Sequence, residues 1–240
     1  MKAAAVVLFL ATLALGQSQT ASQTSTSADS KQRTTVSESL PASSLSKGTW
    51  DFGVWGQGGQ SVSGGTRDVS VGDAGFRIGK ILTEEHLSGW VRGNFEYAVD
   101  LIPLYILSGP FKVLPNPIAF TPGSGTCVIG VKCGPLLANE TAYGGGFNPF
   151  ILRWNFTSGK RVAPFIELGG GVLFTNKDLP LQSSNINFTP QAAVGVNIFT
   201  REKRAVSLDF RYEHISNAGL AKPNPGINTL QGGVGYHWFK

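Results

Sequence analysis

The sequence predicts an all-β protein, an eight-stranded antiparallel β-barrel of the outer-membrane type. Eight segments from residue 49 onward alternate apolar and polar side chains, which is the pattern of strands whose two faces meet different surroundings. Glycine is abundant, at 31 of 240 residues, and aromatic side chains gather near the ends of the apolar faces. Long alternating strands with such aromatic ends are typical of barrels that span a membrane.

Composition divides the chain into three parts. Residues 1–16 have the features of a secretory signal: a lysine at position 2, a short apolar run and a small-residue cleavage motif. The apolar run is too short to cross a bilayer as a helix. Residues 17–47 are rich in Ser, Thr and Gln, and such a segment buries too little apolar surface to order itself, so we expect a disordered linker. The barrel is predicted over 48–240.

The eight predicted strands are joined by connections of alternating length. Their bounds are 49–57, 70–83, 88–105, 142–157, 161–176, 186–199, 204–216 and 229–239. In the third strand, for example, Phe95 and Tyr97 face one way while Asn94 and Glu96 face the other. The connections after strands one, three, five and seven are the longer ones. Because bacterial barrels have short periplasmic turns and longer outer loops, both ends of the barrel are expected on the periplasmic side.

The polar faces carry charged side chains that a membrane barrel turns inward. They are Asp51, Asp73, Arg77, Arg92, Glu96, Asp100, Arg153, Glu167, Asp209, Arg211 and Glu213. Side chains fill the interior of a barrel of this size, and acids and bases that pair there offset the cost of their desolvation. The same alternation allows the inverse, a soluble lipocalin-like barrel with an apolar interior. Long strands with aromatic side chains at both ends favour the membrane.

Composition also limits the partners and cofactors. The net charge is +5 without any Lys/Arg-rich run, which argues against a nucleic-acid partner. The two cysteines, Cys127 and Cys133, lie close together in a Gly/Pro-rich stretch, and the secretory context predicts a local disulfide between them. Two thiols without a nearby histidine are too few ligands for a metal site, and no cofactor is expected. A homodimer is compatible with the sequence.

The most informative motif lies at the outer end of the seventh predicted strand. Positions two apart on a strand share a face, so His214 and Ser216 are expected side by side. Their face continues through Leu208, Phe210 and Tyr212, while the charged side chains of this strand lie on the opposite face. A base and a hydroxyl nucleophile are therefore predicted on the lipid-facing wall, towards the leaflet that holds lipopolysaccharide.

A family resemblance rests on this motif. The run His214-Ile215-Ser216-Asn217-Ala218-Gly219, followed by Lys222-Pro223-Asn224-Pro225-Gly226, resembles the signature of the PagL-type lipid A 3-O-deacylases. Residues 165–169 and 187–191 support the resemblance, which covers most of 48–240 and is strongest from residue 143 onward. It implies an eight-stranded outer-membrane barrel that binds lipid A and hydrolyses its ester-linked 3-acyl chain by a Ser-His-Glu mechanism without a metal.

The resemblance also implies roles for individual residues. Ser216 would attack the acyl carbonyl, and His214 would take its proton and return it to the leaving hydroxyl. The acidic member of the family's triad falls at Asn228, which can hold the imidazole tautomer but supplies no charge. For this reason we expect Asn228→Glu to raise the activity. The candidate donors to the oxyanion are Asn217, Gly219 and Asn224.

Two other functions stay open on the sequence. The asparagine at the acidic position motivates a catalytically weak or inactive outer-membrane barrel with a structural or lipid-binding role. A soluble lipocalin-like carrier is the second alternative, since alternation alone does not fix which face is inside. Turn formation is a further explanation for the Asn, Gly and Pro residues after Ser216, because these residues favour turns for backbone reasons.

Overall fold

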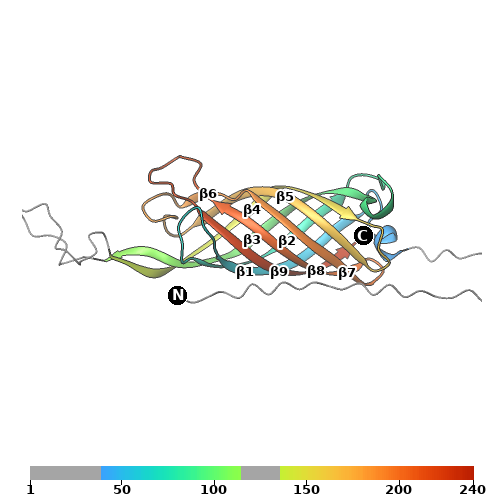
Figure 1. Cartoon of the computed structure of the whole chain (residues 1–240), viewed down its shortest axis with the longest axis horizontal. Helices are drawn as coiled ribbons and strands as arrows, with labels where there is room; N and C mark the ends of the chain where they lie inside the picture. Colours follow the sequence, from blue (N-terminus) through green and yellow to red (C-terminus); the bar gives the residue numbers. More distant parts are fainter. Residues whose placement is uncertain (1–38, 115–135) are drawn as a thin grey trace, which may run out of the picture. The chain divides into compact units, whose positions relative to one another are not determined.

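The computed structural model describes residues 39–114 and 136–240, which form one closed barrel (Figure 1). The predicted signal segment, most of the predicted linker and both cysteines lie outside these residues. No helix in the described ranges is long and apolar enough to cross a membrane. The elements are α1 (Leu40–Ser44), β1 (Trp50–Ser61), β2 (Ser70–Ile81), the 3-10 helix η1 (Gly89–Val91), β3 (Gly93–Leu114), β4 (Leu136–Phe156), β5 (Val162–Thr175), β6 (Ile186–Phe188), β7 (Gln191–Arg201), β8 (Arg204–Ile215) and β9 (Ile227–Phe239).

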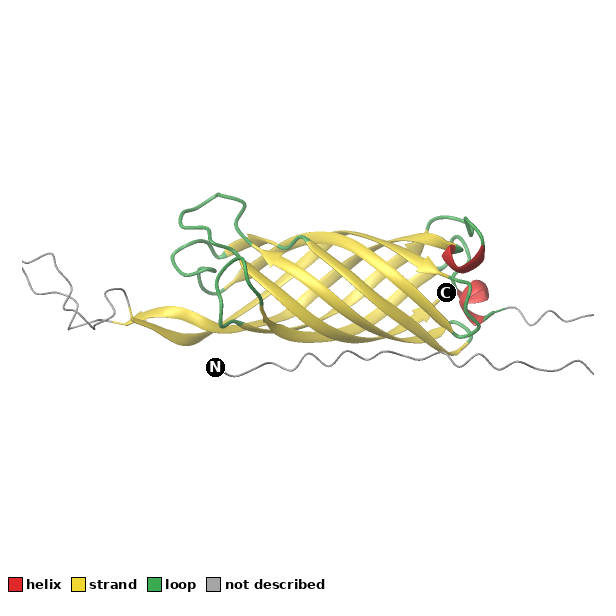
Figure 2. Ribbon diagram, viewed as in Figure 1, coloured by secondary structure: helices red, strands yellow, loops and turns green. Residues whose placement is uncertain are grey.

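The strands form a single antiparallel sheet that closes on itself (Figure 2). The strand order is β4-β3-β2-β1-β9-β8-β7-β5-β6, and an additional pairing of β4 with β5 completes the circle. Both β6 and β7 pair with β5, and only Thr189 and Pro190 separate them. They are one wall strand interrupted at a proline, which has no N–H for the ladder. The wall therefore has eight strands, and the predicted fold class is confirmed.

The wall is apolar outside and polar inside. Large exposed side chains on the outside include Phe76, Leu101, Leu168, Val194, Phe210 and Val234. Charged side chains buried on the inside are Asp51, Asp73, Arg77, Glu96, Asp100, Arg153, Glu167, Arg211 and Glu213. This polarity is the inverse of a soluble carrier's, so the lipocalin-like alternative is excluded and the wall faces hydrocarbon. The predicted location in an outer membrane is confirmed on this ground.

One charged residue departs from the predicted inward orientation. Arg92 precedes β3, and its side chain is 39% exposed, with an ion pair of 3.4 Å to Glu85 outside the barrel. The alternation was extended back to residue 88, but η1 occupies 89–91 and breaks the strand periodicity there. The inward prediction for Arg92 was therefore wrong.

The interior is charged only in its middle part. An apolar cluster fills the end of the barrel that carries the long loops, here called the outer end. It contains Val69, Val71, Ile102, Tyr105, Leu107, Phe111, Ala142, Leu173, Leu179, Ile215 and Ile227. A second cluster fills the opposite, inner end with Leu45, Ile81, Ala163, Phe199, Ala205 and Phe239. Packed apolar layers thus close both mouths of the barrel.

The end of the predicted linker is ordered and belongs to the inner cluster. Residues 39–47 include α1, and Leu45, which follows it, is fully buried. Polar contacts fix this segment to the strand ends: the Lys203 N–H donates to Ser44 Oγ at 2.9 Å, and the Asn94 amide donates to the carbonyl of Leu45. The folded part therefore begins before residue 48, the predicted boundary. A few apolar side chains are enough to order this segment, because they pack into an apolar cluster that the strands form.

The hairpin of β3 and β4 is longer than predicted. The predicted strands end at residue 105 and begin again at residue 142, yet the two strands stay paired out to Leu114 and Leu136. The hairpin extends from the outer end in Figure 1, whereas α1 and the end of β9 lie at the inner end. The ladder continues past Gly109 and Pro110 through a register shift, with Phe111 buried in the outer cluster.

Candidate functional site

The predicted His/Ser pair lies at the outer end of β8, on the outward face of the wall. His214 and Ser216 are half-buried and share this face with the exposed Tyr212. Glu213 and Ile215, which alternate with them, are buried inside the barrel. The strand periodicity therefore places the imidazole and the hydroxyl where the sequence predicted. Their catalytic roles stay a prediction.

The strand interrupted at Pro190 positions the backbone of the pair. The Ser216 N–H donates to the carbonyl of Phe188 at 3.1 Å, and the Phe188 N–H donates to the carbonyl of Ser216 at 2.7 Å. The His214 N–H donates to the carbonyl of Pro190 at 2.9 Å. Short β6 thus continues the ladder beyond β7, and Ser216 is held as a strand residue although β8 ends at Ile215.

Asn228 contacts the imidazole ring directly. His214 and Asn228 are opposite one another in the pairing of β8 with β9, and His214 Nδ1 lies 2.5 Å from Asn228 Oδ1. The Asn228 amide nitrogen donates to the carbonyl of Ser63 at 3.2 Å. Because the amide nitrogen is turned to Ser63, its oxygen faces the ring and accepts the hydrogen from Nδ1. In the neutral ring Nε2 then carries the lone pair that a general base needs.

Gly226 packs against the same ring. It has a φ of +67°, and a Cβ there would lie 2.8 Å from His214 Cε1. Both the backbone conformation and the close approach require glycine. The last glycine of the Pro-Asn-Pro-Gly segment is therefore a contact of the imidazole, rather than turn chemistry alone.

Two of the three predicted oxyanion donors are engaged in the loop itself. Asn217 is fully buried, and its amide nitrogen donates to Ser183 Oγ at 2.7 Å and to the carbonyl of Ala221 at 3.0 Å. The Gly219 N–H donates to Asn217 Oδ1 at 2.8 Å. These bonds organise the loop after Ser216.

Asn224 is placed differently from the other two. Its side-chain oxygen accepts from the Asn217 N–H at 3.3 Å, which leaves the amide nitrogen on the other side of the group. Within the described part of the chain this nitrogen makes no hydrogen bond, and the residue is half-buried. Of the three predicted donors, the Asn224 amide is the one that the loop leaves available.

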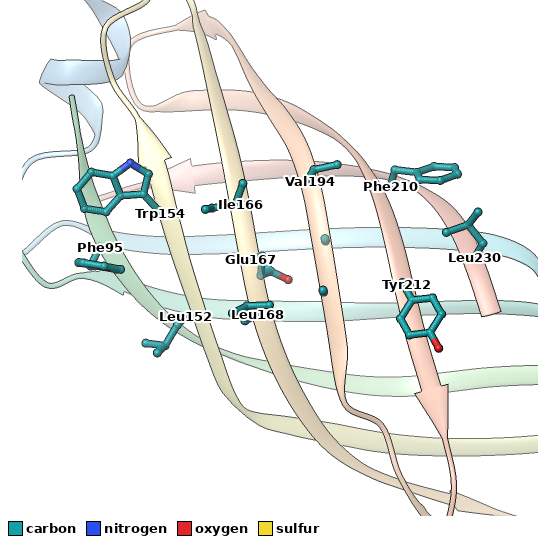
Figure 3. A pocket seen from close by; sticks show the side chains of 12 residues that line it. Phe95, Leu152, Trp154, Ile166, Glu167, Leu168, Val194, Phe210, Tyr212 and Leu230 are labelled. Atoms are coloured by element: carbon teal, nitrogen blue, oxygen red, sulfur yellow. The ribbon is translucent and has the colours of Figure 1, made fainter. Parts of the chain in front are cut away.

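An apolar groove lies on the outer wall beside the site (Figure 3). Its volume is about 510 Å³. One row of its lining crosses neighbouring strands through Leu168, Ala192, Tyr212 and Leu230, which are successive partners in the ladders. The small side chain of Ala192 forms a depression between Leu168 and Tyr212. Since Tyr212 precedes His214 by two residues on the same face, the groove begins directly below the His/Ser pair.

An ionic cluster supports the wall behind the groove. Glu167 accepts hydrogen bonds from Arg77 at 2.7 Å, from Arg153 at 2.9 Å and from Arg211 at 3.1 Å. Arg77 also donates to Asp100 at 2.8 Å. Interleaved charges of this kind were predicted from the polar faces of the strands, and the cluster holds β2, β3, β4, β5 and β8 together.

A second histidine, His237, makes side-chain contacts that were not predicted from the sequence. His237 Nδ1 lies 2.9 Å from both carboxylate oxygens of Asp51, and its Nε2 lies 3.1 Å from Ser207 Oγ. The three side chains have the order of a catalytic triad, but they are at most 3% exposed inside the barrel. A substrate has no path to them, so their role is structural.

Two residues without a predicted role support the His214 ring: Ser63, through Asn228, and Gly226, by direct packing. Ser63 could not be recognised from the sequence, because its contact is made by the backbone carbonyl. Gly226 was predicted only as part of the Pro-Asn-Pro-Gly motif.

Among the described residues, no group of three or more His, Cys, Asp or Glu side chains could hold a metal ion. Cys127 and Cys133 lie outside these residues, so the disulfide stays a prediction, as does the homodimer.

The fold and the site define the class of protein: an outer-membrane β-barrel with a His/Ser pair on its lipid-facing wall. A family model described as lipid A 3-O-deacylase (PagL) matches residues 130–237, which confirms the predicted resemblance to the PagL-type family. The chain matches no curated protein.

Two solved structures are similar to the barrel. The outer membrane enzyme PagL is 17% identical, with a TM-score of 0.47, over 76% of this chain and 97% of its own. The N-terminal β-barrel domain of Pseudomonas aeruginosa OprF is 13% identical, with a TM-score of 0.42, over 80% of this chain and 98% of its own.

Proposed function

We propose that this protein is a lipid A deacylase-like esterase, which hydrolyses an ester-linked acyl chain of lipopolysaccharide. The observation that carries the proposal is the lipid-facing imidazole of His214, held by Asn228 and placed on one face with Ser216. A water-soluble substrate does not reach a site on a hydrocarbon-facing wall, because that wall is not in contact with water. A lipid whose ester bond lies at the boundary of head group and acyl chains meets it directly.

Acyl transfer to Ser216 is the first half of the reaction. The hydroxyl proton passes to His214 Nε2 as Ser216 Oγ attacks the ester carbonyl. The tetrahedral intermediate carries its negative charge on the former carbonyl oxygen, for which the Asn224 amide is the candidate donor. Collapse breaks the bond to the sugar oxygen, which takes the proton from His214, and the acyl group remains on Ser216.

Hydrolysis of the acyl-enzyme is the second half. Water gives a proton to His214 and attacks the acyl carbonyl, and the fatty acid leaves as Ser216 recovers its proton. The apolar groove below the pair supplies a surface for an acyl chain of the substrate. Asn228 orients the ring as an asparagine does in Cys-His-Asn enzymes, without a charge to stabilise imidazolium.

Mass spectrometry of lipid A tests the proposal. We expect cells that express the wild type to lose one ester-linked acyl chain, and cells that express Ser216→Ala or His214→Ala to keep it. Ser158→Ala is the control, because Ser158 is exposed in the turn between β4 and β5 and should leave the activity unchanged. Folding of each variant is checked by the heat-modifiable migration of the barrel on a gel.

The second candidate function is a barrel without catalysis that binds lipid. The neutral Asn228 beside His214 is the observation that favours it. If lipid A stays intact in cells that express the folded wild type, as in those that express the two variants, the result would support this candidate and contradict the esterase.

A further inference from the structure

The orientation of the Asn228 amide depends on the loop between β1 and β2. Asn228 is 7% exposed, and its amide nitrogen donates to the carbonyl of Ser63 at 3.2 Å. If the amide were turned over, its oxygen would face this carbonyl and its nitrogen would face His214 Nδ1. In the flipped amide, the Asn228 side-chain oxygen and the Ser63 carbonyl oxygen, both acceptors, would face each other without a hydrogen between them. This arrangement is unfavourable for buried groups. The Ser63 carbonyl therefore selects the orientation in which Asn228 accepts from His214.

Backbone bonds hold this loop against the start of β9. The Val62 N–H donates to the carbonyl of Asn228 at 2.7 Å, and the Thr66 N–H donates to the carbonyl of Gly226 at 2.8 Å. The loop thus fastens both residues that touch the His214 ring, Asn228 through its amide and Gly226 through its backbone.

Two loop glycines permit this close approach. A Cβ on Gly64 would lie 2.7 Å from Asn228 Nδ2, and a Cβ on Gly65 would lie 2.7 Å from the carbonyl oxygen of Gly226. Gly64 also has a φ of +100°, which a residue with a side chain rarely adopts. The contact between the loop and Asn228 therefore depends on glycine at these positions.

We infer that the Ser63 carbonyl is a positioning group for the reaction, and that the site requires an amide at position 228. The chain of contacts runs from Ser63 through Asn228 to His214 and keeps the hydrogen on Nδ1, so that Nε2 carries the lone pair that a general base needs. This inference rests on the proposed function. It also revises the expectation that a carboxylate at position 228 raises activity, because the second carboxylate oxygen would face the Ser63 carbonyl.

Gly64→Ala and Asn228→Asp test the inference in the full-length protein folded in detergent. In the wild type, ¹⁵N NMR of labelled histidine is expected to show His214 with its hydrogen on Nδ1; the signal is assigned by its loss in His214→Ala. Gly64→Ala should give a mixture of tautomers and a fall in kcat on the order of tenfold or more, with KM nearly unchanged. Asn228→Asp should lower kcat as well.

Gly48→Ala is the matched control. Gly48 has a φ of +86°, and a Cβ there would meet nothing within 4 Å, so this variant has the backbone strain without the clash. We expect it to keep the wild-type tautomer and kcat. A Gly64→Ala protein that behaves like Gly48→Ala, or an Asn228→Asp protein at least as active as the wild type, would overturn the inference.

The tautomer measurement separates this inference from the proposed function. If the wild type has no esterase activity, the proposed function fails, yet the Nδ1–H form and its loss in Gly64→Ala would still support the positioning contact. A wild-type ring with its hydrogen on Nε2 would overturn the inference whatever the activity.

Discussion

At the scale of single residues, Glu167 is the centre of the ionic cluster inside the barrel. Its carboxylate is 2% exposed and contacts three guanidinium groups, those of Arg77, Arg153 and Arg211. Each of these arginines comes from a different strand, so one carboxylate joins four strands of the wall. Removing one member of a buried ionic cluster leaves the others without compensation, which costs far more than breaking a surface pair.

Glu167→Gln is therefore expected to destabilise the barrel by about 3–5 kcal/mol. Urea unfolding in detergent micelles, followed by the heat-modifiable gel band, measures this change. Glu85→Gln is the control, because Glu85 pairs with Arg92 at the surface, where an ion pair contributes about 0–1 kcal/mol. Equal unfolding midpoints for the two variants would show that the interior cluster does not stabilise the fold.

Strand periodicity made part of the site predictable at this scale. Alternation alone places Glu213 inside and His214 outside, and the family resemblance implied Asn228 as the partner of the ring. The contact between Ser63 and Asn228 was not predictable, because it joins residues 165 positions apart through a backbone carbonyl. The occupied amide of Asn217 was missed for a similar reason: its partners Ser183 and Ala221 lie in loops without a periodic pattern.

The segment with α1 is the element whose role differs most from the sequence analysis. Its composition is that of a disordered linker, yet Leu45 inserts fully into the inner apolar cluster beside Ile81 and Phe239. The N-cap Ser39 accepts from the Ala42 N–H at 3.3 Å, and Pro41 lies in the first turn, both of which favour a helix start. Composition averaged over 17–47 concealed these local signals.

Leu45→Ala is expected to destabilise the protein by about 2–5 kcal/mol, since it leaves a cavity in a closed cluster. Leu82→Ala is the matched control, because Leu82 is 46% exposed and its loss leaves no cavity. Urea unfolding of both variants measures the difference. If Leu45→Ala unfolds like the wild type, the segment before β1 is not part of the folded barrel.

At the scale of the whole described structure, residues 39–114 and 136–240 form a closed barrel with an apolar outside and a filled inside. Eight alternating segments were enough to predict this architecture, because a two-residue period in long strands specifies two faces for a sheet, and closure removes its edges. The sequence pattern did not predict that apolar clusters close both mouths, since an apolar side chain on the inner face of a strand end is not distinguishable by residue type from a lipid-facing one. Nor did it predict the length of the β3–β4 hairpin, whose strands were expected to end at residue 105 and to begin again at residue 142.

The same architecture sets one serine beside a histidine on the outer face of the wall and another beside a histidine in the interior. Ser216 lies with His214 on the lipid-facing wall, whereas Ser207 lies with His237 and Asp51 in the closed interior. The interior hollow next to Ser207 has a volume of only about 10 Å³, which is close to the space of one water molecule. The position of each serine relative to the lipid, rather than an acid beside its histidine, therefore determines which serine a lipid can reach.

Covalent labelling with a long-chain alkyl fluorophosphonate tests this central claim most directly, because a serine oxygen that a neighbouring base activates displaces the fluoride and forms a phosphonate ester. After labelling of the protein in detergent, peptide mass spectrometry locates the adduct. We predict a single adduct on Ser216 that is absent in His214→Ala and retained in Ser207→Ala. An adduct on Ser207, or a folded wild type that takes up no label, would contradict the account.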